Sequence, residues 1–306
     1  MAHSEFLIGI RELQQHLQDR GWRVVDCRFE LSQPEKGFSD YLAGHIPGAV
    51  YAHLDRDLAA PPARSGEGSG RHPLPSAEVF ARTLGKWGIT PATRVVVYDQ
   101  GGGSIAARLW WMLHWMGHRS VRLLDGGFPA WERAGLPLST EVPPVAAVTY
   151  EGVADDSMTV STGEVLEALR SGTPLTLVDA RDAARFEGKT EPIDPVAGHI
   201  PGARNFPFST SLTADGSFRS GEDLKKAWSG TLEAAKGRGS GEESRLAAAQ
   251  DAWAVMCGSG VTACHLALSA GLAGLPAPRL YVGSWSEWIR DVSRPVATGP
   301  ADADEA

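Results

Sequence analysis

The chain contains the same domain pattern twice, and this duplication limits its fold more than any other feature. The heptapeptide AGHIPGA stands at Ala43–Ala49 and again at Ala197–Ala203. Three more blocks recur in the same order, at a spacing of about 155 residues. They are Arg23–Arg28 with Leu177–Arg181, Arg94–Ser104 with Ala252–Val261, and Leu124–Trp131 with Tyr281–Trp288. This spacing is far above that of solenoid repeats, so we predict a duplicated domain.

Each half alternates short apolar runs with amphipathic segments, which predicts an α/β fold with a parallel sheet flanked by helices. We expect an N-terminal domain over 1–140, a linker over 141–157, a C-terminal domain over 158–295 and a tail over 296–306. Ser161 and Glu164 have the spacing of a capping box. Predicted helices are Ile10–Asp19, Ala77–Trp87, Ile105–Met116, Gly163–Ser171, Leu224–Ala235 and Val261–Ala273.

Three segments lack the periodicity of helices or strands. Pro137–Ser157 is rich in proline and valine and is predicted to be extended. Ala60–Ser76 and Gly237–Ser244 are predicted to be excursions from the repeated pattern. The first is long enough for a loop without regular structure to suggest a functional role.

Composition excludes several classes of function. The formal charge is −8 and no block of Lys or Arg occurs, which argues against nucleic acid or an anionic membrane as partner. No apolar run is long enough to span a bilayer, and Met1–Leu17 lacks the features of a signal peptide. The odd, low cysteine count favours a reducing compartment, so we expect the cytoplasm. Because tandem halves can bury their own interface, a monomer is expected.

The segment around Cys257 has the pattern of a catalytic loop. An apolar strand ends at Met256, a glycine-rich turn follows, and an apolar helix is predicted from Val261. This places Cys257 at the carboxyl end of a parallel strand, where α/β sheets hold ligands. Gly258 and Gly260 let backbone N–H groups turn inward, and the helix N-terminus adds partial positive charge. Such a cradle lowers a thiol pKa, so Cys257 is predicted to be a nucleophile.

CGSGVTAC resembles the active-site loop of 3-mercaptopyruvate sulfurtransferases, which are tandem-domain members of the rhodanese superfamily. The resemblance extends over both GHIPGA copies, Trp110-Trp111, Leu124-Asp-Gly-Gly and Gly283-Ser-Trp-Ser-Glu-Trp288. It implies that Cys257 takes a sulfur atom from 3-mercaptopyruvate as a persulfide and passes it to a thiol, thioredoxin or cyanide. It implies no metal and no organic cofactor. It also implies an inert N-terminal half, because Gln100 stands where the C-terminal half has Cys257.

The resemblance assigns further residues by position. Ser259, His72 and Asp55 correspond to a proton relay beside the nucleophile. Arg185 corresponds to an arginine that holds the substrate carboxylate, a role that suits its two-pronged donor geometry. The remaining candidates for substrate binding are Arg108, Gly258, Gly260, Val261 and Thr262.

One position departs from the family pattern. In animal 3-mercaptopyruvate enzymes a second carboxylate-binding arginine follows Glu-Pro, whereas here Glu191-Pro192 is followed by Ile193. Loss of a charge-assisted hydrogen bond costs about 1.5–3 kcal/mol of substrate binding. Either another arginine substitutes, or the natural donor is different.

Two other functions are alternatives. A thiosulfate:cyanide sulfurtransferase uses a doubly anionic donor, which the neutral residues Gly258, Ser259 and Gly260 favour less. A non-catalytic protein-binding module is the alternative outside the enzymes, although such modules commonly lack the cysteine. A tyrosine phosphatase is excluded because Cys-x5-Arg is absent: Ala263 stands at the arginine position.

Several conspicuous residues have structural interpretations. Cys264 and Cys27 are expected to pack in the interior. Gly101-Gly102-Gly103 lacks the flanking residues of a nucleotide-binding motif and is expected to form a turn. His45 and His199 are expected to stabilise a turn, because both halves carry them. The tryptophans expected to pack in the core or between domains are Trp110, Trp111, Trp115, Trp131, Trp285 and Trp288.

Overall fold

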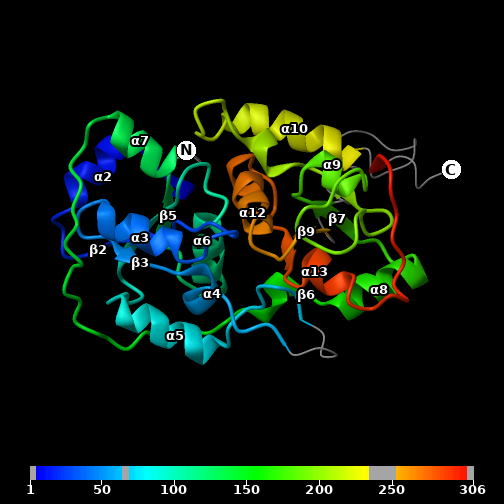
Figure 1. The fold of residues 1–306 in the computed structure, drawn as a ribbon, viewed down its shortest axis with the longest axis horizontal. Helices are drawn as coiled ribbons and strands as arrows, with labels where there is room; N and C mark the ends of the chain where they lie inside the picture. Colours follow the sequence, from blue (N-terminus) through cyan, green and yellow to red (C-terminus); the bar gives the residue numbers. More distant parts are fainter. Residues whose placement is uncertain (1–4, 64–68, 234–252, 302–306) are drawn as a thin grey trace. The chain divides into compact units, whose positions relative to one another are not determined.

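The computed structural model describes residues 5–63, 69–233 and 253–301, and it confirms the α/β fold (Figure 1). The chain divides into two compact units. Unit 1 comprises residues 1–61, 74–156 and 212–218, and unit 2 comprises 62–73, 157–211 and 219–306. Each unit therefore takes a short segment from the opposite half of the sequence. The predicted excursion Gly237–Ser244 lies outside the described residues.

Unit 1 holds a five-stranded parallel sheet in the order β1-β5-β4-β2-β3. Its strands are β1 (Leu7–Ile8), β2 (Trp22–Asp26), β3 (Val50–Tyr51), β4 (Arg94–Tyr98) and β5 (Val121–Leu124). Its helices are α2 (Ile10–His16), α3 (Lys36–Ala43), α4 (Leu54–Asp57), α5 (Ala77–Lys86), α6 (Ala106–Trp115) and α7 (Gly127–Arg133). One part of its core joins Val24 and Val96 of the sheet to Trp131 of α7.

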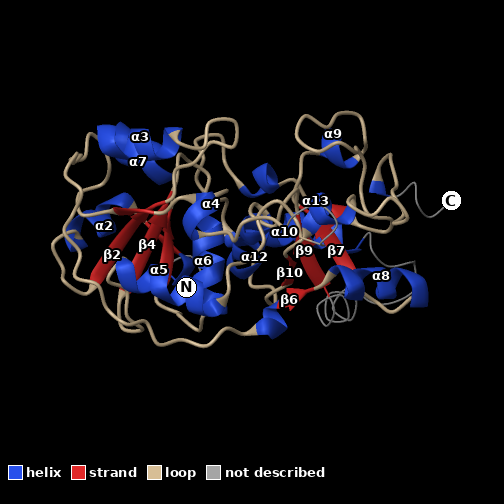
Figure 2. Cartoon of the chain, turned by 60° about the horizontal axis from the view of Figure 1, so that its bottom comes forward, coloured by secondary structure: helices blue, strands red, loops and turns tan. Residues whose placement is uncertain are grey.

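Unit 2 repeats this topology with the order β6-β10-β9-β7-β8, again all parallel (Figure 2). Its strands are β6 (Thr159–Val160), β7 (Thr176–Asp179), β8 (Arg204–Asn205), β9 (Trp253–Met256) and β10 (Arg279–Tyr281). Its helices are α8 (Thr162–Ser171), α9 (Ala183–Phe186), α10 (Gly221–Glu233), α12 (Ala263–Leu272) and α13 (Ser284–Trp288), with short 3-10 turns η1 (Asp156–Met158) and η2 (Phe208–Ser211).

Local signals explain where these helices begin. The predicted capping box starts α8: Ser161 Oγ accepts from Glu164 N–H at 3.2 Å, and Glu164 Oε2 accepts from Ser161 N–H at 2.8 Å. Helix α10 begins three residues before the predicted Leu224, because Ser220 Oγ accepts from Asp223 N–H. Helix α12 begins at Ala263 instead of Val261, since Gly260 has a left-handed φ of 76° that ends the preceding turn.

The stretch predicted to be an extended linker contains no helix before η1 and packs on unit 1. Ser139 pairs with His45, Val148 N–H donates to Gly85 O, and Asp155 N–H donates to Trp115 O. Val148 can approach because residue 85 is glycine: a Cβ there would lie 2.3 Å from Val148 O. Unit 1 therefore extends to Asp156.

A buried ion pair ties each AGHIPGA turn to its sheet. Arg28 binds Asp26 and also donates to Gly44 O at 2.7 Å. Arg181 repeats this arrangement with Asp179 and Gly198 O, also at 2.7 Å. The Asp-x-Arg pattern begins at the last residue of β2 and of β7. In each repeat this pattern and the later AGHIPGA turn therefore support one another.

The AGHIPGA histidines stabilise these turns, as predicted. His45 Nδ1 lies 2.7 Å from Tyr41 O, and its ring stacks on Tyr41. His199 Nδ1 lies 2.8 Å from Phe186 O, and its ring stacks on Phe186.

No helix in the described part of the chain has the length and apolarity that crossing a bilayer requires.

Candidate active site

Cys257 directly follows β9 and is held by its backbone. Every residue of β9 is buried, and Cys257 itself is 3% exposed. Its N–H donates to Ser284 Oγ at 3.1 Å, and its carbonyl accepts from Trp285 N–H at 3.0 Å. The start of α13 therefore fixes both peptide groups of the cysteine. The sulfur is presented at the carboxyl end of the sheet, as the sequence predicted.

The loop after Cys257 leads into the N-terminus of α12. At Gly260 a Cβ would lie 2.3 Å from Val282 O, so only glycine fits there. Val261 O accepts from Cys264 N–H, and Thr262 is the N-cap residue. The partial positive charge of a ten-residue helix is therefore directed at the loop.

Two of the predicted relay residues lie together in unit 2. Ser259 Oγ is 2.7 Å from His72 Nδ1, although 187 positions separate them in the sequence. Both residues are buried. The pair forms because residues 62–73 belong to unit 2. A hydroxyl and an imidazole at this distance can pass a proton.

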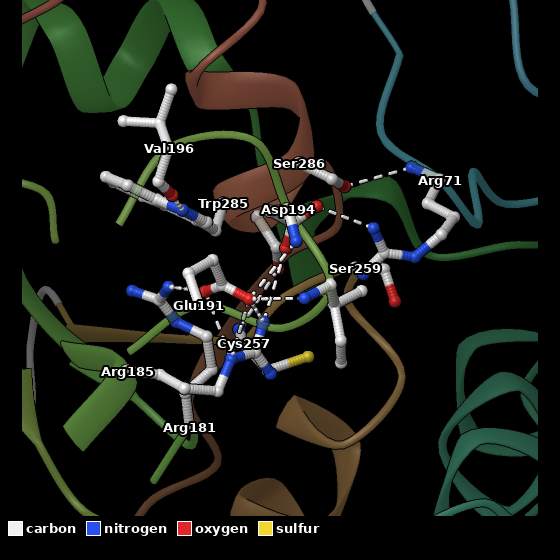
Figure 3. A network of polar contacts seen from close by, with 12 residues as sticks. Arg71, Arg181, Arg185, Glu191, Asp194, Val196, Cys257, Ser259, Trp285 and Ser286 are labelled. Atoms are coloured by element: carbon white, nitrogen blue, oxygen red, sulfur yellow. Dashed lines mark hydrogen bonds and ion pairs between the residues drawn. The ribbon is translucent and has the colours of Figure 1, made fainter. Parts of the chain in front are cut away.

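Next to the loop lies a network of guanidinium and carboxylate groups, all in unit 2 (Figure 3). Arg185 Nε and Nη2 donate to Glu191, the latter at 2.7 Å. Arg185 Nη2 also lies 3.3 Å from Asp194 Oδ2, and Arg71 Nη1 donates to Asp194 Oδ1 at 2.6 Å. Asp194 therefore joins the two arginines. Both are at the active loop, since a Cβ on Gly258 would be 3.3 Å from Arg71 Nη2 and 3.6 Å from Arg185 Nη2.

Charged partners in this network shift the pKa of Glu191 and of Arg181. Burial acts to raise the pKa of Glu191, but hydrogen bonds from Arg185 and from the N–H groups of Asp194 and Ile193 leave it below its ordinary value. Burial acts to lower the pKa of Arg181, but the charges of Asp179, Glu191 and Cys257 leave it raised.

Arg71 is a candidate that the sequence did not reveal. Its Nε is buried, and neither Nε nor Nη2 hydrogen-bonds to any residue within the described ranges. These two groups form the edge of a guanidinium that grips a carboxylate with two parallel bonds. The corresponding edge of Arg185 is already taken by Glu191. The one signal in the sequence that could have identified Arg71 is its position next to His72 in the segment Ala60–Ser76.

The other two predicted side chains belong to unit 1. Asp55 lies in α4, and its N–H donates to His53 Nδ1 at 3.1 Å. Arg108 lies in α6, is buried, and donates from Nε and Nη2 to Leu58 O at 3.3 Å.

Among the described residues, no group of three or more His, Cys, Asp or Glu side chains is placed to bind a metal ion.

Comparison with known proteins gives the family. A rhodanese-like domain model matches residues 10–134 and 161–291. The chain belongs to the rhodanese family. A Pseudomonas aeruginosa protein with 3-mercaptopyruvate sulfurtransferase in its name is 45% identical over 297 residues, covering 97% of this chain and 99% of that relative. A Mycobacterium tuberculosis protein with thiosulfate sulfurtransferase in its name is 39% identical over 304 residues, covering 98% and 99%.

Solved structures agree with this family. The 3-mercaptopyruvate sulfurtransferase from Leishmania major has a TM-score of 0.78 at 29% identity, covering 95% of this chain and 75% of that one. The resemblance seen in the sequence is thereby confirmed, together with two rhodanese-like domains.

The rhodanese-like loop of unit 1 is filled by its own side chains. The Asp99 carboxylate accepts from the N–H groups of Gly101, Gly103, Ile105 and Ala106, at 2.9–3.1 Å. Gln100 is paired with the backbone of Phe29, as both donor and acceptor. The turn at Gly101–Gly103 is thus structural, as predicted.

The strand register makes Asp99, and not the predicted Gln100, the counterpart of Cys257. Tyr98 pairs with Asp26 as Met256 pairs with Asp179, and Asp99 O accepts from Phe128 N–H as Cys257 O accepts from Trp285 N–H. The prediction of Gln100 at this position is therefore wrong by one residue, and the unit 1 loop still lacks a thiol.

The remaining cysteines are buried in their units. Burial raises the pKa of Cys27 well above its ordinary value, so its thiol stays neutral. Cys264 lies in α12, where its thiol is 3.4 Å from Gly260 O. Of the tryptophans, Trp111, Trp131, Trp285 and Trp288 are almost completely buried. Trp285 also carries Arg181 over its ring, at 4.7 Å from the centroid.

Ser284 supports Cys257 at a conformational cost. Its φ is 52°, and no other non-glycine residue in the described ranges has a positive φ. In unit 1 the matching residue is Gly127, with φ 58°. The Ser284 hydroxyl donates to Tyr281 O and accepts from Cys257 N–H. Serine is strained there, and its hydroxyl anchors the backbone of Cys257.

We expect Ser284→Gly to lower kcat about tenfold, because Cys257 N–H loses its partner. The free energy of unfolding should change by less than about 1 kcal/mol, since relief of backbone strain offsets the lost hydrogen bonds. Steady-state turnover and thermal unfolding measure the two effects. A kcat equal to that of the parent would show that the Ser284 hydroxyl does not position Cys257.

Proposed function

We propose that the protein is a sulfurtransferase that moves a sulfur atom from 3-mercaptopyruvate to a thiol or cyanide through a Cys257 persulfide. The observation that carries the proposal is the placement of Cys257 between β9 and the N-terminus of α12, with Arg71 and Arg185 at the same loop. The names of the Pseudomonas aeruginosa relative and the Leishmania major structure support the donor.

The first step cleaves the donor C–S bond. Cys257 thiolate attacks the donor sulfur, an S–S bond forms, and the electron pair of the C–S bond leaves on carbon as the enolate of pyruvate. The donor thiol gives up its proton, and the enolate takes one up. Ser259 and His72, 2.7 Å apart, are proposed to move this proton. Asp55 is proposed to complete the relay.

The second step returns the enzyme to its thiolate. An acceptor thiolate or cyanide attacks the outer sulfur of the persulfide, the S–S bond breaks, and its electron pair stays on Cys257. The product is an acceptor persulfide or thiocyanate. N–H groups of Gly258, Gly260, Val261 and Thr262, together with the α12 dipole, are proposed to stabilise anionic sulfur in both steps.

The donor carboxylate is proposed to bind Arg71 more directly than Arg185. The free Nε/Nη2 edge of Arg71 suits a bidentate contact, whereas Glu191 occupies that edge of Arg185. Arg71 would thereby replace the arginine that the family pattern places at Ile193. Arg185 then attracts the donor carboxylate by its positive charge, and its Nη1 group is proposed to hydrogen-bond to that carboxylate. Arg108 is retained as a further candidate for donor binding.

We expect Arg71→Met to raise KM for 3-mercaptopyruvate about tenfold to a hundredfold with little change in kcat, because a charge-assisted contact made before the transition state is lost. Arg185→Met should have a smaller effect on KM and a larger one on stability, since it leaves Glu191 without its partner. Steady-state kinetics and thermal unfolding of both variants test this. A larger KM increase in Arg185→Met would assign the carboxylate to Arg185.

The proposed sulfurtransferase function also suggests the acceptor, the oligomeric state and the cellular location. Thioredoxin or a small thiol is the proposed acceptor, and a monomer is the proposed state. The cytoplasm is the proposed location, which three free cysteines and a persulfide intermediate support.

A steady-state comparison of the two donors, with cyanide as acceptor, tests the function. We expect a large preference in kcat/KM for 3-mercaptopyruvate. Preference for thiosulfate would retain the Cys257 chemistry and assign the thiosulfate:cyanide activity, which the Mycobacterium tuberculosis relative's name favours. Turnover with neither donor would support a binding module instead.

A further inference from the structure

Asp194 is a buried acid at the active loop with no role in the transfer chemistry proposed above. It lies in the segment between α9 and β8, where it is only 8% exposed, whereas the neighbouring Ile193 is 44% exposed. A Cβ on Gly258 would be 3.7 Å from Asp194 Oδ2, so the acid lies beside the residue that follows the nucleophile. An acid here opposes the binding of any anionic donor.

Asp194 bridges the two arginines that face the loop. Oδ1 accepts from Arg71 Nη1 at 2.6 Å, and Oδ2 accepts from Arg185 Nη2 at 3.3 Å. Its backbone N–H donates to Glu191 Oε1 at 3.1 Å. Because Arg71 is held through Nη1, its Nε/Nη2 edge is left to face the loop. Asp194 therefore orients the arginine and also offsets its charge.

The network is electrically balanced because of Asp194. Three guanidinium groups, of Arg71, Arg181 and Arg185, lie with three carboxylates, of Asp179, Glu191 and Asp194. A balanced cluster can bind a monoanion through directed hydrogen bonds, but it offers no surplus positive charge for a second negative charge. Five of the six side chains are at most 14% exposed, and that of Arg71 is 27% exposed, so a bound donor is poorly screened from this balance of charge.

We propose that Asp194 determines donor specificity: it presents Arg71 to the carboxylate of a monoanionic donor and, by its charge, disfavours a dianionic donor such as thiosulfate. This inference rests on the sulfurtransferase function proposed above. The discrimination operates when the donor binds, before the persulfide forms. No new bond or co-reactant is required.

The test is kcat/KM for 3-mercaptopyruvate and thiosulfate in Asp194→Asn, with cyanide as the common acceptor. Asparagine keeps the shape and one acceptor oxygen but removes the charge. We expect the ratio of the two kcat/KM values, mercaptopyruvate over thiosulfate, to fall by at least about tenfold, mainly through faster reaction with thiosulfate. Glu187→Gln, which removes an acid that pairs with Lys189 and with none of the three arginines, should leave the ratio unchanged.

A purely structural role for Asp194 predicts a different result. Arg71 would then lose its orientation, both donors would react more slowly, and Asp194→Asn would resemble Arg71→Met. That result, or an unchanged ratio in a folded variant, would overturn the proposal. If Asp194→Asn unfolds at a lower temperature than the parent, Asp194→Ser should give the same shift in ratio. Failure of the parent enzyme to use either donor would instead overturn the underlying function, and this inference with it.

Discussion

Replacement of Cys257 by serine is expected to abolish sulfur transfer from either donor, with kcat/KM falling by about a thousandfold or more. Serine differs little in size, so the anchoring bonds to Ser284 and Trp285, which involve only the backbone of residue 257, should persist. The hydroxyl is a far weaker nucleophile than a thiolate at neutral pH and cannot hold a persulfide. Steady-state assays with both donors and thermal unfolding measure the result.

The matched control for this experiment is Cys264→Ser. Cys264 lies in α12 only seven positions away, and its thiol is directed at Gly260 O, a contact that a serine hydroxyl can reproduce. We expect this variant to keep most of its activity. Substantial turnover in Cys257→Ser, or complete loss in Cys264→Ser, would remove Cys257 as the nucleophile.

The second large effect is expected from Gly260→Ala. Gly260 and Gly274 have nearly the same left-handed conformation, with φ of 76° and 73°. They differ in their surroundings: a Cβ on Gly260 would lie 2.3 Å from Val282 O, whereas nothing lies within 4 Å of one on Gly274. Both alanine variants carry the cost of a left-handed residue, about 1–2 kcal/mol. Only Gly260→Ala must also displace the backbone at Val282.

That displacement should reach the nucleophile. Val282 is two residues before Ser284, whose hydroxyl accepts from Cys257 N–H. We therefore expect Gly260→Ala to lose at least about a hundredfold in kcat and to unfold at a lower temperature than Gly274→Ala. Gly274→Ala should keep nearly full activity. Equal activity in the two variants would show that the Gly260–Val282 contact does not shape the active loop.

Local patterns in the sequence predicted the parts of the site that adjacent residues build. The strand, the turn and the helix around Cys257 follow from an apolar run, two glycines and a second apolar run, all within about twenty positions. The capping box at Ser161 and the repeated Asp-x-Arg and AGHIPGA blocks are local for the same reason. The observed first residues of α10 and α12 differ from the predicted ones, because Ser220 and Gly260 determine where these helices begin.

The contacts that sequence reasoning could not supply are those between distant segments. Arg71 meets Asp194 across 123 positions, because residues 62–73 fold into unit 2. Nothing periodic marks either residue. Likewise, Arg185 was expected to hold the substrate, and no sequence pattern indicated that Glu191 occupies its donor edge. The membership of Leu212–Phe218 in unit 1 was also not expected.

The mechanism requires a persulfide on Cys257, which intact-mass spectrometry can detect. The purified enzyme is incubated with 3-mercaptopyruvate without an acceptor, and its mass is measured before and after cyanide is added. We predict a gain of one sulfur atom, assigned to Cys257 by peptide mapping and removed by cyanide as thiocyanate. No gain in mass, or a sulfur atom located on Cys27 or Cys264, would rule out a persulfide mechanism at Cys257.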